Sequence, residues 1–236
     1  SGLLRRILAD TVIPRIRLGS LDPRLISDEL AQLYNPKSYK LKANDARLLP
    51  HWHLSLQSGS DEILKKMRRG YTAKRYENIV KKIRQNNPLF SLTTDIIVGF
   101  PGETAKDFKD TCGFVKKIDF TKVHVFPFSP RPGTPAAQMT DTIQDKIKTE
   151  RVKKLITIAD KTSRNFIKQF IGLVRPVLFE HNPSTKSARA GGLMRGKKNL
   201  VWKGYTPEYF TVKYKSSKNL QNKIVDVKIT SSSILQ

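Results

Sequence analysis

The stretch that decides the fold runs from Thr94 to Pro135. It opens with Thr94-Asp-Ile-Ile-Val-Gly-Phe-Pro-Gly-Glu103 and closes with Lys122-Val-His-Val-Phe-Pro-Phe-Ser-Pro-Arg-Pro-Gly-Thr-Pro135. Residues 95–98 form a short, mostly apolar run, which the glycines and the proline of residues 99–102 stop abruptly. An apolar run bounded by turn residues in this way predicts a buried strand that ends in a tight loop.

A helix and a second strand are predicted to follow this loop directly. Thr104 and Asp107 have the spacing of a capping box, which predicts a helix that starts after Thr104. A helical stripe of apolar side chains follows, formed by Phe108, Cys112, Val115 and Ile118. Residues 123–126 form the next strand, so the segment is a β-α-β unit with parallel strands and a right-handed crossover. In such sheets, ligands bind at the loops beyond the carboxyl ends of the strands.

The first 171 residues repeat this pattern. Strands are expected at residues 16–21, 52–57, 94–98 and 123–128, each followed by helical or loop material. The predicted fold class is therefore α/β, with a parallel sheet that forms part of a (β/α) TIM-like barrel. Four units are too few to close an eight-stranded barrel, and the helix expected at residues 3–9 has no strand in front of it. The sequence is therefore expected to begin in the middle of a fold.

The character of the sequence changes after Gly172. Short β-rich runs at residues 174–180, 200–202, 210–214 and 224–229 are separated by Asn, Ser, Gly and Lys. This pattern predicts a second domain, residues 172–236, folded as a small antiparallel β-barrel. Small basic barrels often bind RNA. The candidate RNA-binding residues of this domain are Lys197, Lys198 and Lys203.

Two aromatic residues of the second domain allow two interpretations. Trp202 and Phe210 could stack on RNA bases, or they could form the core of the barrel. We favour the core, because large aromatic side chains bury most of their surface in small domains.

Charge is the strongest signal in the composition. Lys and Arg number 44 against 20 Asp and Glu, a net charge of +24, which favours a polyanionic partner such as nucleic acid. A solvated lysine-rich surface is the alternative. No apolar run is long enough to span a membrane, so no membrane partner is expected. The single cysteine excludes internal disulfides and indicates a reducing, cytoplasmic location.

Four motifs, in order along the chain, resemble the methylthiotransferase family of radical S-adenosylmethionine enzymes. They are Leu54-Ser-Leu-Gln-Ser-Gly-Ser60, Met67-Arg-Arg-Gly-Tyr-Thr72, the stretch from Thr94 to Glu103, and Phe128-Ser-Pro-Arg-Pro-Gly-Thr-Pro135. Residues 122–129 are most similar to the branch that acts on threonylcarbamoyladenosine beside the tRNA anticodon, and the isopentenyladenosine branch is the near alternative. Residues 172–236 are similar to the family's C-terminal TRAM domain.

The resemblance implies an architecture and a set of cofactors. Members of the family use S-adenosylmethionine and two [4Fe-4S] clusters, one in an N-terminal domain and one held by a three-cysteine loop of a partial six-strand (β/α) barrel. This chain is similar to barrel strands three to six plus TRAM, so the cluster ligands are expected to lie outside it and the chain alone is expected to be inactive. Cys112 belongs to an apolar stripe and cannot replace them. The implied partner is the tRNA anticodon stem-loop, with the chain monomeric or associated with the missing part.

The resemblance also implies which residues orient the cofactor. The expected S-adenosylmethionine-binding residues are Ser20, Asp22, Gln57, Ser58, Asp95, Gly99 and Phe126. Asp95 is expected to be buried and ranks below the polar groups at the strand ends. Gly99 either allows close approach of an adenine ring or is a plain turn glycine. Arg131 is expected to contact a tRNA phosphate or a cofactor carboxylate, and no catalytic or metal-binding side chain is expected.

Two other functions stay open at this point. The chain could be a non-catalytic RNA-binding module, which its charge would also explain. A cluster-free β/α enzyme with different chemistry is disfavoured, because His51 and His53 form an i, i+2 pair on one strand without an evident third ligand.

Overall fold

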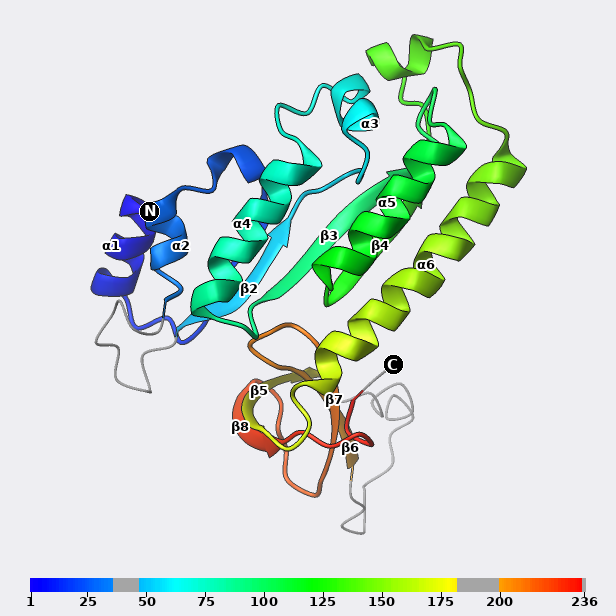
Figure 1. Ribbon diagram of the computed structural model, residues 1–236. Coiled ribbons are helices and arrows are strands. Elements are labelled where there is room, and N and C mark those ends of the chain that lie inside the picture. The colour runs from blue at the N-terminus through cyan, green and yellow to red at the C-terminus, as the bar shows by residue number, and fades with distance from the viewer. Residues whose placement is uncertain (36–46, 182–199, 235–236) are drawn as a thin grey trace. The chain divides into compact units, whose positions relative to one another are not determined.

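The computed structural model describes residues 1–35, 47–181 and 200–234 (Figure 1). The chain divides into two compact units, Ser1–Asn165 and Phe166–Gln236. The first unit contains helices and a parallel sheet, and the second contains an antiparallel sheet. The assignment of residues 1–171 and 172–236 to separate domains stays a prediction.

The first unit is built on a four-stranded parallel sheet in the order β1-β2-β3-β4. The strands are β1 (Ile16–Leu21), β2 (Leu48–Leu54), β3 (Ser91–Val98) and β4 (Lys122–Pro127). Neighbouring parallel strands need a connection that crosses one face of the sheet, and helices usually provide it. The predicted α/β class with a parallel sheet is confirmed.

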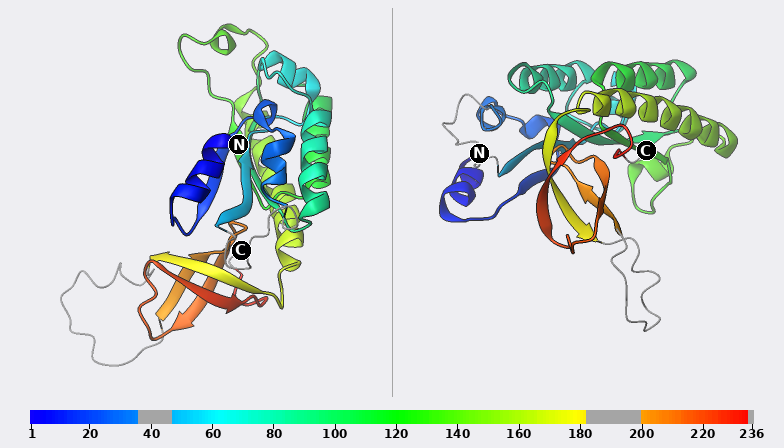
Figure 2. Two further views of the ribbon diagram at one scale, coloured as in Figure 1. Left: turned by 90° about the vertical axis from the view of Figure 1, so that its left-hand side faces the viewer. Right: turned by 90° about the horizontal axis from the view of Figure 1, so that it is seen from below.

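Helices cover one face of this sheet. The helices are α1 (Gly2–Asp10), α2 (Asp28–Gln32), α3 (Asp61–Lys66), α4 (Ala73–Asn86), α5 (Ala105–Ile118) and α6 (Asp145–Lys168), with 3-10 turns η1 (Pro23–Leu25) and η2 (Pro135–Gln138). Figures 1 and 2 show α4, α5 and α6 packed side by side on the same face, and α1 on the other side of the sheet. Among the described helices, α4, α5 and α6 therefore leave the opposite face of β3 and β4 uncovered.

Strand β3 shows how the sequence distinguishes the two faces. Successive side chains of a strand point to opposite faces. The side chains toward the helices are buried, namely Leu92, Thr94, Ile96 and Val98. Asp95 lies on the other face, and its side chain is 35% exposed. The expectation that Asp95 is buried was therefore wrong, because Asp95 lies on the face away from the helices and nearer than the buried Thr93 to the carboxyl end of the strand.

Strand β2 begins and ends earlier than predicted. It starts at Leu48, which pairs with Ile16 of β1, and stops at Leu54. The predicted strand end at Gln57 lies in the following loop, where Gln57 has a φ of 67°. This left-handed conformation interrupts the strand, although Gln57 still makes one bridge to Ile96 of β3.

The predicted features of α5 are confirmed. The Thr104 hydroxyl accepts a hydrogen bond from the Asp107 backbone, and the Asp107 carboxylate accepts one from the Thr104 backbone, which completes a capping box. The apolar stripe faces the core, since Phe108, Cys112, Val115 and Ile118 are all buried. The helix ends at Ile118, followed by Asp119 in the left-handed region with φ 52°.

The second unit is an antiparallel sheet in the order β7-β6-β5-β8. Its strands are β5 (Val174–His181), β6 (Leu200–Tyr205), β7 (Thr211–Ser216) and β8 (Lys223–Lys228). Trp202 and Phe210 are buried at 2% and 3% exposure, so their assignment to the core is confirmed. A Cβ at Gly204 would lie 2.5 Å from Val177 and 2.7 Å from the Leu178 carbonyl oxygen, so β5 and β6 pack closely here because residue 204 has no side chain.

None of the helices among the described residues combines the length and the apolar character that crossing a bilayer requires.

One buried acidic side chain on α4 predicts a pH-dependent stability. Glu77 is 4% exposed and pairs with Lys81 at 2.7 Å, Lys117 at 2.9 Å and Lys74 at 3.6 Å. Hydrogen bonds from Lys81 and then Lys117 lower the pKa of Glu77 from 4.5 to about 2. A depressed carboxyl pKa stabilises the fold above the unfolded value and loses that effect as the pH falls through the folded value.

We therefore expect Glu77→Gln to lower the urea midpoint of unfolding at pH 7. The difference from the unsubstituted protein should shrink as the pH falls from about 4.5 towards about 2, because both proteins then carry a neutral side chain there. Glu150→Gln, an exposed position on α6, is the control and should leave the midpoint unchanged. A difference that persists at the lowest pH would contradict this explanation.

Candidate functional site

The carboxyl ends of the four parallel strands lie along one edge of the first sheet (Figure 1). The loops that leave this edge follow Leu21, Leu54, Val98 and Pro127. They carry most of the residues predicted to bind a cofactor, and in parallel sheets ligands bind at this edge.

At the end of β1, Asp22 is engaged by a neighbouring arginine. Its carboxylate accepts hydrogen bonds from the Arg24 backbone at 2.8 Å and from the Arg24 guanidinium at 3.0 and 2.9 Å. The hydrogen bond from the Arg24 side chain is the main reason that the pKa of Asp22 is lowered. Ser20 is exposed and has a φ of 54°. Of these two side chains, Ser20 is therefore the one that presents its polar group directly to solvent.

At the end of β2, the backbone of Gln57 extends the sheet. Its amide donates to the Asp95 carbonyl at 2.9 Å, and its carbonyl accepts from the Ile97 amide at 3.0 Å. The residues before it are held by two tyrosine hydroxyls, because Tyr71 donates to Leu56 at 3.1 Å and Tyr76 donates to Leu54 at 2.9 Å. The position of the Gln57 backbone is therefore determined by contacts on both sides.

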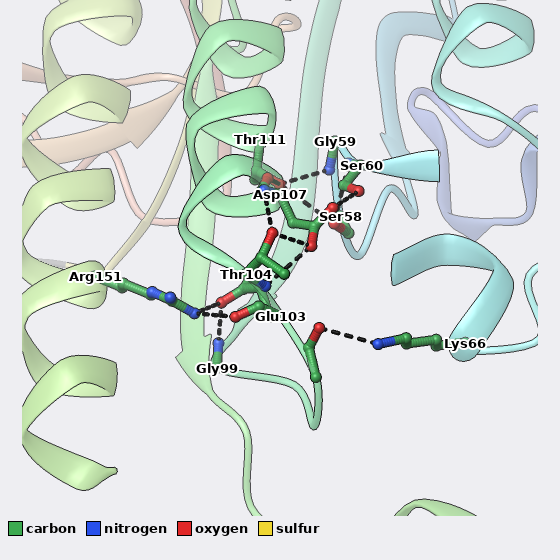
Figure 3. A network of polar contacts seen from close by, with 11 residues as sticks. Ser58, Gly59, Ser60, Lys66, Gly99, Glu103, Thr104, Asp107, Thr111 and Arg151 are labelled. Atoms are coloured by element: carbon green, nitrogen blue, oxygen red, sulfur yellow. Dashed lines mark hydrogen bonds and ion pairs between the residues drawn. The ribbon is translucent and has the colours of Figure 1, made fainter. Parts of the chain in front are cut away.

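Ser58 lies inside a network of polar contacts between this loop and α5 (Figure 3). Its hydroxyl is 3.3 Å from the Thr111 hydroxyl and accepts from the Ser60 amide at 3.2 Å. The side chain is completely buried. Ser58 therefore joins the loop to α5, and its predicted contact with a cofactor stays a prediction.

The same network fixes Asp107 at the start of α5. The Ser60 hydroxyl donates to its carboxylate at 2.6 Å, and the Thr104 hydroxyl donates to the other oxygen at 2.6 Å. Burial acts to raise the pKa of Asp107, but the hydrogen bonds from Ser60 and Thr104 hold it below its usual value. A Cβ at Gly59 would lie 2.7 Å from the Thr111 backbone, so the loop and the helix approach too closely for any larger residue.

The loop after β3 is held by a buried ion pair with α6 (Figure 3). Glu103 accepts a hydrogen bond from the Gly99 amide at 2.7 Å and pairs with Arg151, whose guanidinium also donates to the Glu103 carbonyl at 3.0 Å. The side chains of Glu103 and Arg151 are 1% and 12% exposed. Burial raises the pKa of Glu103, so the arginine is needed to compensate the carboxylate.

Gly99 has a structural reason to be glycine. Its φ is 72°, and a Cβ there would lie 2.3 Å from the Lys148 side chain on α6. The left-handed backbone and the close approach of Lys148 both favour glycine at this position. The predicted contact of Gly99 with an adenine ring stays a prediction.

A second group of polar side chains lies on the face of the sheet away from α4 and α5. We call it the polar face, and it consists of His51, His53, Thr93, Asp95 and His124. The Thr93 hydroxyl is 3.0 Å from His51 Nε2 and 3.0 Å from His53 Nδ1, and His53 Nε2 is 3.3 Å from the Asp95 carboxylate.

The polar face continues onto β4 towards the carboxyl edge of the sheet. His124 is paired with Asp95 in the sheet register, and its ring centre is 6.3 Å from that of His53. Burial lowers the pKa of His124. Phe126 follows two residues later and is 49% exposed. Asp95 and Phe126 were predicted from the sequence as site residues, whereas Thr93 and His124 were not, although period-2 alternation along the strands places all of them on one face.

The residues predicted to bind RNA are described only in part. Arg131 is exposed in the loop after β4, and Lys203 is exposed on β6. Lys197 and Lys198 lie outside the described residues. Tyr205 and Tyr209 follow Lys203 in the sequence. Their rings stack with centres 5.1 Å apart, and Tyr209 is 38% exposed.

Comparison with known proteins identifies relatives for this arrangement. A family model described as the radical SAM superfamily matches residues 39–115. The threonylcarbamoyladenosine tRNA methylthiotransferase MtaB of Bacillus subtilis is 34% identical over 217 residues, which are 92% of this chain and 44% of that protein. Its counterpart from Thermotoga maritima is 45% identical over 166 residues, 70% of this chain and 36% of that protein. The chain is a relative of the radical S-adenosylmethionine methylthiotransferases.

A second kind of tRNA methylthiotransferase is also similar to this chain. The tRNA-2-methylthio-N(6)-dimethylallyladenosine synthase of Carboxydothermus hydrogenoformans is 35% identical over 216 residues, 92% of this chain and 44% of that protein. The chain thus spans less than half the length of these curated relatives.

A solved structure supports the fold of the first unit. Coproporphyrinogen III oxidase (HemN) from Escherichia coli, described as a radical SAM enzyme, is similar with a TM-score of 0.51 and 16% identity, covering 68% of this chain and 36% of that one. At this identity the likeness concerns the fold alone. The parallel sheet therefore resembles the (β/α) sheet of radical S-adenosylmethionine enzymes.

The chain's own residues do not fit an iron–sulfur cluster. Cys112, the one cysteine of the sequence, is buried within α5, and burial raises the pKa of its thiol. Clusters of this kind are held by several cysteine thiolates. Among the described residues, no group of three His, Cys, Asp or Glu side chains is arranged to hold a metal ion.

The ion pair between Glu103 and Arg151 predicts a large effect of substitution. Arg151→Met should lower the free energy of unfolding by about 3–5 kcal/mol, because it leaves the buried Glu103 carboxylate without its partner. Combining it with Glu103→Gln should recover part of this loss, since no charge then remains buried. Urea unfolding measures both changes.

Lys153→Met provides the matched control for this prediction. Lys153 lies on the same helix and is exposed, so its substitution should change the free energy of unfolding by less than about 0.5 kcal/mol. Equal stabilities of Arg151→Met and Lys153→Met would show that the ion pair does not hold the loop.

Proposed function

We propose that this chain contributes to a tRNA methylthiotransferase, in which it orients S-adenosylmethionine and the target adenosine and binds the tRNA. The observation that carries the proposal is the polar face beside the carboxyl edge of a parallel sheet, in a chain whose relatives are named for tRNA methylthiolation. In this family, S-adenosylmethionine supplies the radical and the methyl group. The residues of this chain would hold and orient it and keep water from the reacting groups.

The polar face has groups that suit the chemistry of S-adenosylmethionine. The Asp95 carboxylate is 35% exposed and can accept hydrogen bonds from ribose hydroxyls. The Phe126 ring is 49% exposed and offers an aromatic surface on which an adenine ring can stack. Ser20 and the backbone of Gln57, at the same edge of the sheet, would complete the contacts to the polar end of the cofactor.

The remaining predicted residues would act less directly. Asp22 would contribute through its ion pair with Arg24. Ser58 and Gly99 would contribute by fixing the two loops that border the site, because both are engaged in contacts with helices. These three residues are therefore proposed to act as positioning residues.

The second unit is proposed to be the RNA-binding part, a TRAM-like domain. Its antiparallel sheet, the exposed Lys203 and the stacked pair of Tyr205 and Tyr209 support this assignment. Exposed lysines neutralise phosphates, and exposed aromatic rings stack on unpaired bases. Arg131 in the first unit would contact a tRNA phosphate. The net charge of +24 over the whole chain is consistent with such a partner.

We propose threonylcarbamoyladenosine as the modified nucleoside that is recognised. The residues 122–129 favour this branch, and the relative with 45% identity carries that name. Isopentenyladenosine is the alternative, since a synthase named for its dimethylallyl form is 35% identical. A non-catalytic RNA-binding role is a third possibility. We further propose that the protein acts in the cytoplasm as a monomer or together with a cluster-binding part, and that the chain alone forms no methylthio nucleoside.

Binding of anticodon stem-loops tests the proposed function. Stem-loops that carry threonylcarbamoyladenosine, isopentenyladenosine or plain adenosine at the position beside the anticodon would be titrated with the chain by fluorescence anisotropy. We expect the threonylcarbamoyladenosine form to bind most tightly. We also expect affinity to fall at least about tenfold between 50 and 200 mM salt, because each neutralised phosphate adds roughly 0.7–0.9 to the slope of log affinity against log salt.

Two variants separate the contributions to this binding. Lys203→Ala should reduce the salt slope by about 1 without changing the preference among the three stem-loops. Tyr209→Ala should weaken binding of all three by about 1–3 kcal/mol if the ring stacks on a base. Equal affinity for the three stem-loops would favour the non-catalytic RNA-binding role, and a preference for isopentenyladenosine would favour the other branch.

A further inference from the structure

Four side chains of the polar face form a continuous ladder of hydrogen bonds along β2 and β3. In order they are His51, Thr93, His53 and Asp95, with separations of 3.0, 3.0 and 3.3 Å. The Thr93 hydroxyl lies between two imidazole rings and has a single proton to donate. The direction of each hydrogen bond in the ladder is therefore coupled to the next.

The ladder has one consistent arrangement when both histidines are neutral. An ionised Asp95 only accepts hydrogen bonds, so His53 must carry its proton on Nε2 and donate it to the carboxylate. His53 Nδ1 is then an acceptor and takes the proton of the Thr93 hydroxyl. The Thr93 oxygen accepts in turn from His51, which therefore carries its proton on Nε2.

Adding a proton to His53 reverses the middle of the ladder. The His53 ring then donates from both nitrogens, so the Thr93 oxygen accepts from His53 and its hydroxyl must find another acceptor. Thr93 is 1% exposed, and a buried hydroxyl proton without an acceptor costs about 1–3 kcal/mol. Of the two contacts of the Thr93 hydroxyl, the one that can become its acceptor is His51 Nε2, provided that the His51 proton moves to Nδ1, where the new N–H group requires an acceptor in turn.

We propose that His53, Thr93 and His51 form a proton relay, in which protonation of His53 reverses the hydrogen bonds through Thr93 and moves the ring proton of His51 from Nε2 to Nδ1. One proton is gained in total. His53 goes from one ring proton to two, Thr93 keeps its one, and His51 keeps one on the other nitrogen. No electron is transferred and no other bond changes.

The surroundings of His51 hold its ring neutral. Asp95 of β3 contacts His53, and the ring of His124 on β4 lies near the ring of His53. The charge of Lys122 contributes to lowering the pKa of His124, after burial. Burial, followed by the charge of Arg17 on β1 and the neighbouring His53, lowers the pKa of His51 to about 3. His51 therefore stays neutral over the pH range in which an ordinary histidine changes charge, about 5 to 8.

The relay ends at a surface that a ligand can reach. The His53 and Asp95 side chains are 20% and 35% exposed, whereas His51 and Thr93 are buried. A ligand with a group that takes or gives a proton, such as a ring nitrogen of adenine, would meet the relay at His53 and Asp95. The inference goes beyond the proposed function, because it rests on the ladder and holds for any such ligand.

Nuclear magnetic resonance of the 236-residue chain with ¹⁵N-labelled histidine tests the relay directly. The ring ¹⁵N shifts and long-range couplings show which nitrogen of each histidine carries a proton. His51→Asn, His124→Asn and His181→Asn, made in turn, assign three of the four histidines directly and His53 by elimination. As the pH is lowered, we expect His51 to remain neutral and to change from the Nε2–H to the Nδ1–H form as the second ring proton of His53 appears.

Two substitutions at Thr93 show whether the hydroxyl is the link. Thr93→Ser keeps the hydroxyl and should keep the tautomer change of His51, whereas Thr93→Val removes it and should abolish the change. Retention of the change in Thr93→Val would overturn the relay. So would a His51 tautomer that stays constant through the protonation of His53 in the unsubstituted chain, a result that needs no variant to fold. Loss of selective stem-loop binding would contradict the proposed function without affecting this outcome.

Discussion

The alternation of side chains along β3 is the constraint on which the first unit depends. A strand with neighbours on both sides must satisfy its backbone within the sheet, so its side chains alone decide what lies above and below it. On β3, one set is mostly apolar and is buried against the helices, while the other set carries Thr93 and Asp95. The same division extends to β2, where it separates Trp52 and Leu54 from His51 and His53. Core and polar face are therefore two consequences of one period-2 pattern.

Buried polar contacts then hold the loops at the carboxyl edge in defined positions. Asp107 ties the loop after β2 to the start of α5, and Glu103 ties the loop after β3 to α6. Each of these carboxylates is satisfied by several donors, which buried charges require. The motif residues in these loops thus have structural partners in the chain, whereas Asp95 and Phe126 on the strands are partly exposed.

Much of the fold was predictable from local sequence because its signals are local. The capping box at Thr104, the apolar stripe of α5 and the antiparallel second unit depend on residues close together in the chain. The boundaries of β2 were not predictable in this way. Leu48 pairs with Ile16 of β1, a residue that is distant from it in the sequence. The left-handed backbone of Gln57 depends on its contacts with β3. The candidate site was predicted only in part for the same reason. Asp95 and Phe126 were predicted, but Thr93 was missed because a threonine within a strand carries no functional signal of its own.

The sequence by itself determined the α/β class of the first unit, the antiparallel second unit and the resemblance to radical S-adenosylmethionine methylthiotransferases, since these follow from periodicity, turn residues and ordered motifs. Only the tertiary structure decided what the individual residues contact. It brought Arg151 to Glu103 across 48 positions of sequence, and it placed Thr93 between two histidines of a neighbouring strand. The physical reason is that strand register and helix packing are set by the whole core, whereas a hydrogen bond depends on separations of about 3 Å.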